Sequence, residues 1–298
     1  MNIDVSLDLY KIYCAVVRTG NMSAAAKELY ISQPAVSMSI KQLEERMGST
    51  LLVRTAKGVR TTPEGDILYE YLEQALGLIK TAEKKYFEMV NMENGEIKIG
   101  ASDTVIAHFL MPYLEKYHTL YPDINIKVTN KTTYETLKLL KNGSVDLCFI
   151  NLPISEDTDL EITECLKIHD CLLGGIKYQT LSQKGIDIQQ ITKYPLLLLE
   201  DLSNSRRYID QYAKENGVIL EPIIELGSSD LLIDFTRINL GLTFVIKEFT
   251  KKEIDNQSLF EIPLNPVIPE RSIGLVKLKN VALSHAARGF TNLLKIEI

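Results

Sequence analysis

The sequence of 298 residues is long enough for two or three folded units, and its hydrophobic content of 45% is that of a globular protein. The formal net charge of −6 argues against a polyanionic partner if the chain is taken as a whole. The charge is uneven, however, because residues 1–62 carry eight basic and five acidic side chains. A small basic segment on an acidic body suits local binding to phosphates, although chance variation over so short a segment gives the same pattern.

Membrane and metal signals are lacking in the sequence. The N-terminal segment contains Asp4 and Asp8 in place of a basic stretch followed by an apolar one, and no later apolar run reaches membrane-spanning length. We therefore expect a cytoplasmic protein that does not bind membranes. Reduced thiols and no metal site are expected, because no zinc-type spacing with histidine occurs at Cys14, Cys148, Cys165 or Cys171.

Residues 23–47 predict two short helices joined by a tight turn. Ser23 is placed to cap the first helix, and Ser32 and Pro34 fit the N-cap and first turn of the second. The first helix is expected to support the second through a compact apolar face made of Ala24, Ala25, Ala26, Leu29 and Tyr30.

The second helix has an apolar face and a polar face. Its apolar residues recur at helical spacing and are expected to pack inward; they are Val36, Ile40, Leu43 and Met47. Gln33, Ser37, Met38 and Lys41 are then left on the outer face. Gln can pair with adenine, Ser with either base edge, and Lys with phosphate or guanine, so this face is predicted to lie in a DNA major groove.

A basic hairpin is predicted directly after these helices. Gly58 permits a tight turn, and Arg54, Lys57 and Arg60 around it would meet the DNA backbone. The residues predicted to contact DNA are Ser23, Ser32, Gln33, Pro34, Ser37, Met38, Lys41, Arg54 and Lys57. A helical hairpin without DNA-binding function would share the apolar pattern, but it would explain neither the outward polar residues nor the basic wing.

The N-terminal segment resembles the LysR-type transcriptional regulators. The matching residues occur in order and at the spacing of that family: the small residues of the first helix, SQPAVS, Ile40, Leu43-Glu44, Gly48, Leu51-Leu52, Arg54, Gly58, Thr61 and Gly65. The resemblance implies an α/β protein with a winged helix-turn-helix domain at 1–62, a linker helix at 63–93 and a two-lobed effector domain at 94–298 that is similar to periplasmic binding proteins.

A single long helix is predicted from Pro63 to about Met92, since this segment has no internal proline. An apolar stripe along it follows heptad spacing and consists of Leu68, Leu72, Ala75, Ile79, Ala82 and Tyr86. The stripe is expected to pair two chains in a dimer; the alternative is that it packs on its own chain. The resemblance further implies that two dimers join in a tetramer that bends promoter DNA, with RNA polymerase kept open as a further partner.

Strands and helices alternate after Gly95, as expected of a parallel sheet covered by helices. A second series of the same kind begins at Tyr194. By the resemblance, the chain passes between lobes near Cys165 and returns near Leu264. Lobe one is then residues 94–164 and 265–298, lobe two is residues 165–264, and a ligand cleft lies between them.

Short polar residues occur where strands end or helices begin, which are the places where such sheets bind ligands. Those predicted to contact an effector are Ser102, Thr132, Thr133, Asn151, Ser203, Ser205, Arg206, Ser228 and Thr243. Each has an alternative role, since helix caps use the same residue types without any ligand. Ser102, Thr132 and Ser203 are the preferred candidates.

No cofactor is expected. The sequence does narrow the chemical class of the effector. Free helix ends suit a small carboxylate, yet Asp103 and Asp230 follow two of the candidate serines and Glu200-Asp201 adds acid nearby. We hypothesise an amino acid or amine, with Arg206 or Lys131 available for a carboxylate. The alternative is that both aspartates only stabilise their helices.

Three other functions are less consistent with the sequence. The scattered histidines and the lack of a phosphate loop or nucleophile elbow give no catalytic residues and no enzyme. A solute-binding protein for transport would need export and no DNA-reading helix. A thiol-based redox regulator could use Cys165 and Cys171, although only Lys167 and His169 nearby would favour a thiolate.

Overall fold

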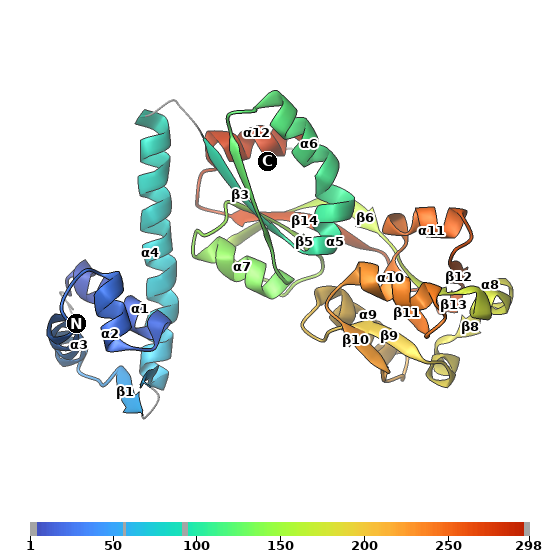
Figure 1. The fold of residues 1–298 in the computed structure, drawn as a ribbon, viewed down its shortest axis with the longest axis horizontal. Coiled ribbons are helices and arrows are strands. Elements are labelled where there is room, and N and C mark those ends of the chain that lie inside the picture. The colour runs from blue at the N-terminus through green and yellow to red at the C-terminus, as the bar shows by residue number, and fades with distance from the viewer. Residues whose placement is uncertain (1–4, 56–57, 91–94, 295–298) are drawn as a thin grey trace. The chain divides into compact units, whose positions relative to one another are not determined.

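The computed structural model describes residues 5–55, 58–90 and 95–294. The chain divides into two compact units, Met1–Met89 with Lys141–Gly143, and Val90–Leu140 with Ser144–Ile298. The first unit holds the predicted helix-turn-helix and most of the long helix (Figure 1), and the second holds both predicted lobes.

The N-terminal unit is a winged helix-turn-helix, as predicted. Its helices pack around one apolar core that includes Tyr13, Val36, Ile40 and Leu43. The wing is an antiparallel pair of strands after the third helix. The elements are α1 (Leu7–Thr19), α2 (Met22–Glu28), α3 (Gln33–Met47), β1 (Leu52–Thr55) and β2 (Gly58–Thr61).

The predicted cap of the first of the two DNA-reading helices was wrong. Asn21, not Ser23, is the N-cap of α2, and its side-chain oxygen accepts from the backbone N–H of Ser23 at 2.8 Å and of Ala24 at 3.1 Å. The helix begins two residues earlier than expected, because Asn21 is already extended and offers the better acceptor. The caps predicted for α3 are present: Ser32 Oγ accepts from Ala35 N at 3.3 Å, and Pro34 lies in the first turn.

Two members of the predicted apolar face are not in the core. Ala24 is exposed, and Tyr30 is 96% exposed in the turn between α2 and α3. Tyr30 has a left-handed backbone with φ of +56°, which turns its side chain away from the core that a continued helix would have reached.

Tight contacts explain three residues of the family signature. The Glu44 carboxylate at the end of α3 accepts from the backbone N–H groups of Leu51 (2.8 Å) and Leu52 (3.1 Å), so it fixes the start of the wing. Gly58 has φ of +133°, and a β-carbon there would overlap the carbonyl oxygen of Gly20. A β-carbon at Gly65 would overlap the carbonyl oxygen of Leu51.

The long helix α4 spans Pro63–Val90, as the sequence predicted to within two residues. The predicted stripe does not have one role along its length, because Leu68 and Leu72 pack against the core of the N-terminal unit. This part follows the alternative in which the stripe packs on its own chain. The rest of the stripe is exposed; it consists of Ala75, Ile79, Ala82 and Tyr86.

Lobe one is built on a five-stranded sheet of order β4-β3-β5-β14-β6. Its core includes Ile97, Ile99, Phe149 and Phe290. The strands are β3 (Glu96–Ala101), β4 (Asn125–Asn130), β5 (Leu147–Asn151), β6 (Leu160–Ile168) and β14 (Arg271–Leu278). The helices are α5 (Asp103–Val105), the π-helical η1 (Ile106–Leu110), α6 (Met111–Leu120), α7 (Thr133–Lys141) and α12 (His285–Leu293).

Lobe two has its own five-stranded sheet of order β10-β9-β11-β7-β12, beside a short pair β13-β8. The strands are β7 (Asp170–Gly174), β8 (Ile186–Asp187), β9 (Leu196–Leu199), β10 (Ile224–Leu226), β11 (Leu242–Ile246), β12 (Phe260–Ile262) and β13 (Leu264–Asn265). The helices are η2 (Ile176–Tyr178), α8 (Gln179–Lys184), η3 (Ile188–Lys193), α9 (Asn204–Glu215), α10 (Ser229–Arg237), η4 (Lys247–Phe249) and α11 (Lys251–Asp255).

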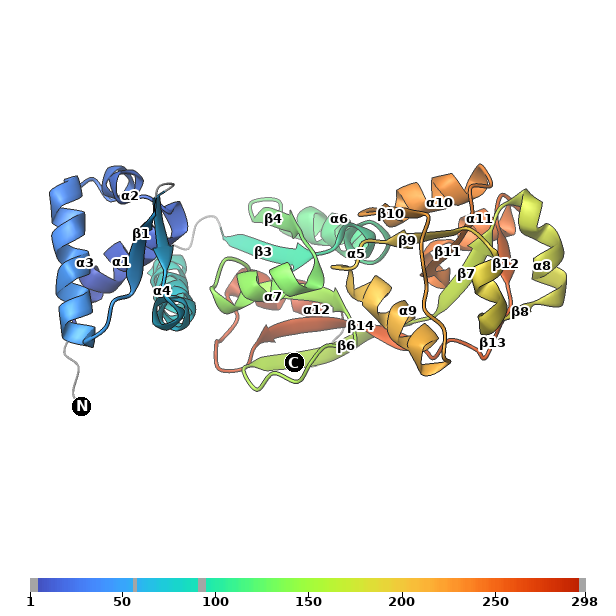
Figure 2. The ribbon, with the colours of Figure 1, turned by 90° about the horizontal axis from the view of Figure 1, so that it is seen from below.

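The sheets and the crossing points differ from the expectation in detail. Both sheets are mixed, because β14 is antiparallel to β5 and β6, and β7 is antiparallel to β11 and β12. The paired strands β6 and β14 lead to the passage between lobes, as Figure 2 shows. The chain leaves lobe one at His169, after Cys165, and returns over residues 266–270, after Leu264. A sequence repeat of strand and helix does not reveal strand direction, so the antiparallel returning strand was missed.

Candidate functional site

The outer face of α3 carries the side chains predicted to read bases. Gln33 and Lys41 are exposed, Met38 is 71% exposed, and Ser37 is half-buried. The Gln33 Nε2 donates to Ser37 Oγ at 2.9 Å, so these two residues share one surface one turn apart. Such a pair offers an amide and a hydroxyl to a base edge from one place on the helix.

The remaining predicted DNA contacts lie around this face. Ser32 and Pro34 are exposed in the first turn of α3, Ser23 is exposed on α2, and Arg54 is exposed on β1 of the wing. Lys57 lies outside the described residues. Free helix ends and exposed cations are the groups that bind DNA phosphates.

Tyr30 is a surface residue that the sequence reasoning placed in the core. Its ring is 96% exposed beside the start of α3, and a left-handed backbone holds it there. A large exposed aromatic ring with a hydroxyl is well suited to contact a sugar or a phosphate. The signal in the sequence was its place directly before the turn residue Ile31, where α2 has already ended.

A cleft of about 260 Å³ lies between lobe one and lobe two. Polar side chains from both lobes line it, which agrees with the expected edge of the two sheets. The predicted residues that it brings together are Ser102, Thr132, Thr133, Asn151, Ser203 and Ser205. Its charged groups are Asp103, Lys131 and Glu135.

Two of the preferred candidates already serve as helix caps. Ser102 Oγ accepts from Val105 N at 3.4 Å. Thr132 and Glu135 bond reciprocally: Thr132 N and Oγ1 donate to the Glu135 carboxylate at 3.1 and 2.9 Å, and Glu135 N donates to Thr132 Oγ1 at 3.4 Å. The hydrogen bond from the Thr132 hydroxyl lowers the pKa of Glu135, which therefore stays anionic.

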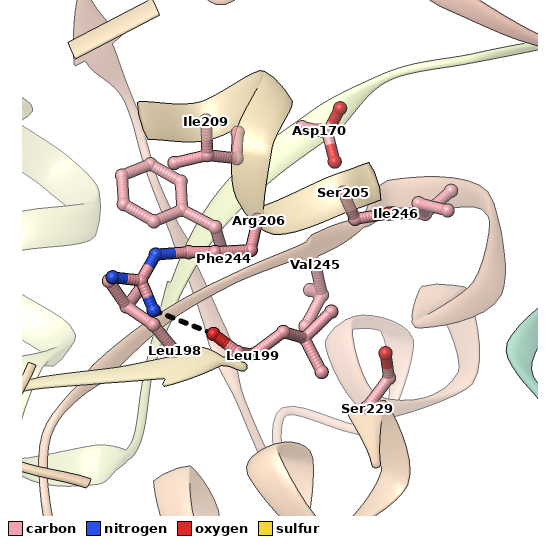
Figure 3. A pocket seen from close by; sticks show the side chains of 10 residues that line it. All are labelled: Asp170, Leu198, Leu199, Ser205, Arg206, Ile209, Ser229, Phe244, Val245 and Ile246. Atoms are coloured by element: carbon pink, nitrogen blue, oxygen red, sulfur yellow. Dashed lines mark hydrogen bonds between the residues drawn. The ribbon is translucent and has the colours of Figure 1, made fainter. Parts of the chain in front are cut away.

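Three predicted effector contacts are absent from the lining of the cleft. Arg206 is 9% exposed, and its guanidinium donates to Leu199 O at 2.7 Å (Figure 3), to Asp210 and to Glu225, so it is not available for a ligand carboxylate. Ser228 caps α10 through Leu231 N, and its neighbour Ser229 lines the cleft instead. Thr243 is fully buried inside strand β11.

The end of β5 and the start of α9 meet at the floor of the cleft. Asn204 Nδ2 donates to the backbone oxygens of Asn151 (2.5 Å) and Pro153 (3.2 Å), and Asn151 Nδ2 donates to Ser205 Oγ at 3.3 Å. These bonds tie lobe two to lobe one. The sequence reasoning named Ser203 and Ser205 on either side of Asn204 but not Asn204 itself.

A buried ion pair lies where the two crossing segments meet. Arg271, the first residue of β14, donates to the Asp170 carboxylate at 2.5 and 2.8 Å, and both side chains are nearly inaccessible. Arg271 Nη2 also donates to Ser205 Oγ at 3.0 Å. The pair therefore connects the crossing point directly to a residue of the cleft.

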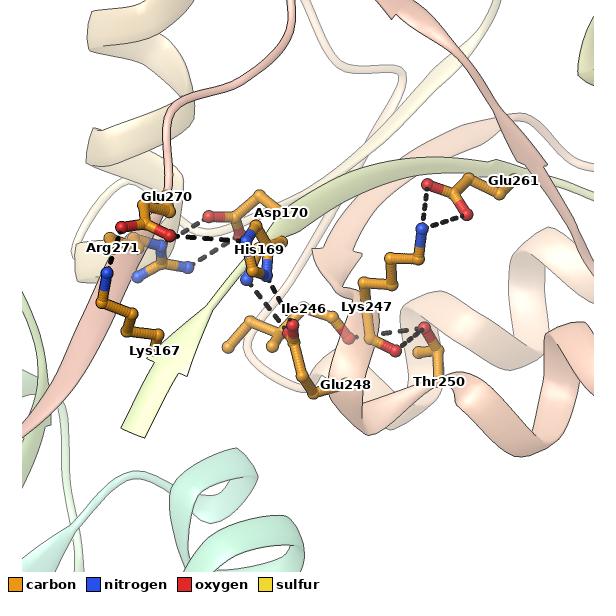
Figure 4. A network of polar contacts seen from close by, with 10 residues as sticks. All are labelled: Lys167, His169, Asp170, Ile246, Lys247, Glu248, Thr250, Glu261, Glu270 and Arg271. Carbon is orange, nitrogen blue, oxygen red and sulfur yellow. Dashed lines mark hydrogen bonds and ion pairs between the residues drawn. The ribbon is translucent and has the colours of Figure 1, made fainter. Parts of the chain in front are cut away.

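An exposed network surrounds this ion pair, as Figure 4 shows. His169 Nδ1 lies 2.7 Å from a Glu248 oxygen, and its Nε2 lies 3.6 Å from Glu270. Glu270 also pairs with Lys167 at 2.6 Å. The network joins the outgoing and the returning segment of the chain between the lobes.

Two further contacts link the lobes at the first helix of lobe one. Thr104 Oγ1 donates to Ser229 Oγ at 3.1 Å. His108 lies 3.4 Å from Asp230 and stacks on Phe249, with ring centroids 5.0 Å apart. Opening the cleft would break these contacts.

The cysteines show no sign of an activated thiol. Burial raises the pKa of Cys165 to about 11, and it raises the pKa of Cys171 further above the ordinary range. The two residues lie on different sheets, β6 and β7. A protonated thiol is a poor nucleophile toward peroxide, so this environment does not favour redox sensing.

No group of three or more His, Cys, Asp or Glu residues that could hold a metal ion is found among the described residues. Over residues 5–55, 58–90 and 95–294, no helix combines the length and the apolar character needed to cross a membrane.

Two protein-family profiles match the chain. Residues 7–66 match "Bacterial regulatory helix-turn-helix protein, lysR family", and residues 91–297 match "LysR substrate binding domain". Together the two matches cover the α3 surface and the interlobe cleft.

Similar proteins span nearly the whole chain. The transcriptional regulator CysL of Bacillus subtilis is 28% identical over 269 residues, which cover 90% of each protein. A probable RuBisCO transcriptional regulator of Trichormus variabilis is 26% identical, over 97% of this chain and 88% of its own. Among solved structures, ArgP from Mycobacterium tuberculosis has a TM-score of 0.71 at 17% identity, covering 98% of this chain and 97% of its own. Full-length CbnR complexed with its target DNA has a TM-score of 0.64 at 18% identity, covering 98% and 99%.

Proposed function

Since the chain belongs to the LysR family and is a DNA-binding transcriptional regulator with an effector-binding domain, we propose that a small polar effector in the interlobe cleft controls how it engages promoter DNA. The family is one of regulators rather than enzymes. The effector, its control of DNA bending and the assembly of the chain are the proposed parts.

The proposed DNA contacts are the outer face of α3 and the wing. Gln33 and Ser37 are paired on one exposed surface, which suits direct readout of a base, and the exposed Arg54 suits a phosphate. The solved complex of CbnR with its target DNA supports a DNA-bound state for this fold.

The proposed assembly is a dimer through α4. Ile79, Ala82 and Tyr86 are exposed along the half of the helix that does not pack on the N-terminal core, and apolar side chains at this spacing can pair two helices. When two helix-turn-helix domains are linked in a dimer, binding of the first raises the effective concentration of the second at its half-site, and the dimer gains affinity. The target is therefore proposed to be an inverted repeat. A tetramer that bends DNA, a contact with RNA polymerase and a cytoplasmic location complete the proposal.

Control by an effector rests on one observation: the polar cleft is bridged by hydrogen bonds from both lobes. Thr104 with Ser229 and Asn204 with Asn151 join the lobes around the cavity. A ligand that contacts both walls would favour one degree of closure over another, and closure would alter how the dimers pack. The redox alternative has no comparable support, because Cys165 and Cys171 are buried thiols with raised pKa values.

The proposal is tested by footprinting the purified full-length protein on the promoter regions next to its own gene. We expect an interrupted inverted repeat to be protected, and we expect a metabolite extract to change the length or the bending of the protected region. A Lys214→Ala variant is altered at the exposed far end of α9, away from the cleft, and should give the same footprint as the unaltered protein. Binding to no promoter fragment at low ionic strength would refute the regulator; binding that no extract alters would refute the effector control.

A further inference from the structure

Met38 is a large apolar side chain on the outer face of α3. It is 71% exposed, whereas Val36 and Ile40, two residues away on either side, are buried in the core of the N-terminal unit. In a helix of about 3.6 residues per turn, a residue two positions from each of them lies about 160° around the axis from both. Met38 is therefore on the side of α3 that is opposite to the core.

This position is the one that enters a groove most deeply. A recognition helix lies in the major groove with its outer face toward the bases, and the residues of its N-terminal part contact the base edges. Met38 is the sixth of the 15 residues of α3, and so belongs to the N-terminal half. In the proposed complex with DNA, its side chain faces bases rather than phosphates.

Two rows of side chains lie next to each other on this part of α3. Gln33 and Ser37 are one turn apart and hydrogen-bonded at 2.9 Å, and they form a polar row. Pro34 and Met38 are also one turn apart and both exposed, and they form an apolar row beside it. An A·T base pair presents the hydrogen-bonding groups of adenine and the methyl group of thymine in the major groove. The two rows therefore match the two kinds of group on such a pair.

The chemistry of methionine narrows the base that the apolar row can read. Of the four bases, thymine alone presents an apolar group in the major groove, its C5 methyl. The unbranched thioether side chain of Met38 can adjust its rotamers to pack against that methyl group. Against guanine or cytosine, the same side chain would cover acceptors or a donor without bonding to them, which is unfavourable. Met38 thus favours thymine and disfavours a G·C pair at one position.

We propose that Met38 is a specificity-determining residue that packs against the C5 methyl group of a thymine, within one base pair of the position that Gln33 reads. This proposal rests on the proposed DNA contact of α3 and adds the base and the chemical group that the apolar row recognises. The half-site then contains a thymine whose methyl group contributes to affinity.

The test uses the full-length protein and the half-site found by footprinting. Each thymine of the half-site is replaced in turn by deoxyuridine, which keeps the hydrogen-bonding groups of thymine and lacks only the C5 methyl. We expect one replacement to weaken binding about fourfold, the value for removing one methyl group from water. Gel-shift titrations measure the ratio of the two affinities, and this part of the test needs no protein variant.

Variants at position 38 connect the methyl group to the methionine. Met38→Gln, which is of similar length but polar, should bind the thymine and the deoxyuridine duplex equally well, whereas Met38→Leu should keep the preference for thymine. Thermal unfolding should be unchanged in both variants, because Met38 is not part of the core. Arg54→Ala is the matched control: its exposed side chain is assigned to a phosphate, so both duplexes should be weakened by the same factor.

Contrary results separate this proposal from the proposed function. If no replacement by deoxyuridine weakens binding, or if Met38→Gln keeps the full preference for thymine, Met38 does not read a methyl group. In that case, a loss of half-site discrimination in Gln33→Ala would leave α3 in the major groove, and unchanged discrimination would refute the DNA contact of α3 as well. If Gln33→Ala relaxes the preference only at base pairs distant from the methyl-dependent thymine, the two rows do not read neighbouring positions.

Discussion

The α3 surface and the interlobe cleft both present short polar side chains, but they are assembled in opposite ways. Gln33, Ser37 and Lys41 come from one helix of 15 residues, and each points outward because its neighbours on the other face are apolar. The cleft draws its lining from α5, α7, β5, α9 and α10, which are far apart in the sequence. A site on one helix can be read from periodicity, whereas a site built from many segments depends on how those segments pack.

The two surfaces should also respond differently to substitution. On the outer face of α3, Gln33 bonds to Ser37 and Lys41 pairs with Glu45, so changes at Gln33 and at Lys41 should act almost independently of each other. Ser205, Asn151, Arg271 and Asp170 form one hydrogen-bonded chain, so changes there should be coupled.

The largest effect is expected from Arg271→Met. This change leaves the Asp170 carboxylate buried without its partner, and breaking a buried ion pair in this way costs about 3–5 kcal/mol. Urea denaturation of the full-length protein, followed by a signal from the C-terminal unit, should show the loss.

The control is the double variant Arg271→Met with Asp170→Leu. Because no charge is then left unpaired, the double variant should be more stable than Arg271→Met alone. A double variant no more stable than Arg271→Met would show that the lost stability does not come from an unpaired Asp170 charge.

Gln33→Ala should weaken binding to the preferred half-site by about 1–3 kcal/mol through loss of base readout, with a smaller effect on unrelated DNA. Gel-shift titrations on the footprinted half-site and on scrambled DNA measure the ratio. Gln42→Ala is the matched control, since Gln42 is exposed on the same helix but outside the predicted reading face. An unchanged ratio for Gln33→Ala would remove this residue from the readout.

Arg54→Ala should weaken binding to all sequences and lower the slope of log affinity against log salt by about 1 for each helix-turn-helix domain bound, because each domain loses one phosphate contact. Affinities measured over a series of salt concentrations test this. A loss confined to one DNA sequence would instead make Arg54 a base contact.

The smallest effect is expected at the cysteines. Cys165→Ala and Cys171→Ala should leave DNA binding unchanged with or without peroxide, because burial raises both pKa values and keeps the thiols protonated at neutral pH. Gel shifts before and after peroxide treatment measure this. A peroxide response that vanishes in either variant would revive the redox alternative.

Local pattern predicted most of the N-terminal unit. The apolar spacing of Val36, Ile40 and Leu43 defined the inner face of α3, and Ser32 and Pro34 marked its start. The errors at Ser23 and Tyr30 fall at the ends of α2, where an Asn two residues earlier and a left-handed turn residue decide the geometry. Helix ends are the least certain part of such predictions, because a shift of one or two residues costs little.

The effector domain was predicted as a type of fold but not as a set of contacts. Alternating strands and helices indicated two lobes, and six of the nine candidate residues line the cleft. Arg206 was misjudged because its partners Asp210 and Glu225 become close only when α9 packs beside β10. The antiparallel strand β14 was missed for the same reason, because its pairing with β5 and β6 cannot be deduced from the residues of β14 alone.

The sequence by itself determined that α3 has a polar outer face, because helical periodicity is a property of neighbouring residues. Only the tertiary structure decided which polar groups of the cleft are occupied and which are open. Thr132 and Ser203 look alike in the sequence. In the structure, Thr132 is hydrogen-bonded to Glu135, whereas the side chain of Ser203 caps no helix N–H group. Donors and acceptors form hydrogen bonds with the groups that the fold brings within reach of them. Which donors and acceptors are left without a partner is therefore known only from the three-dimensional structure.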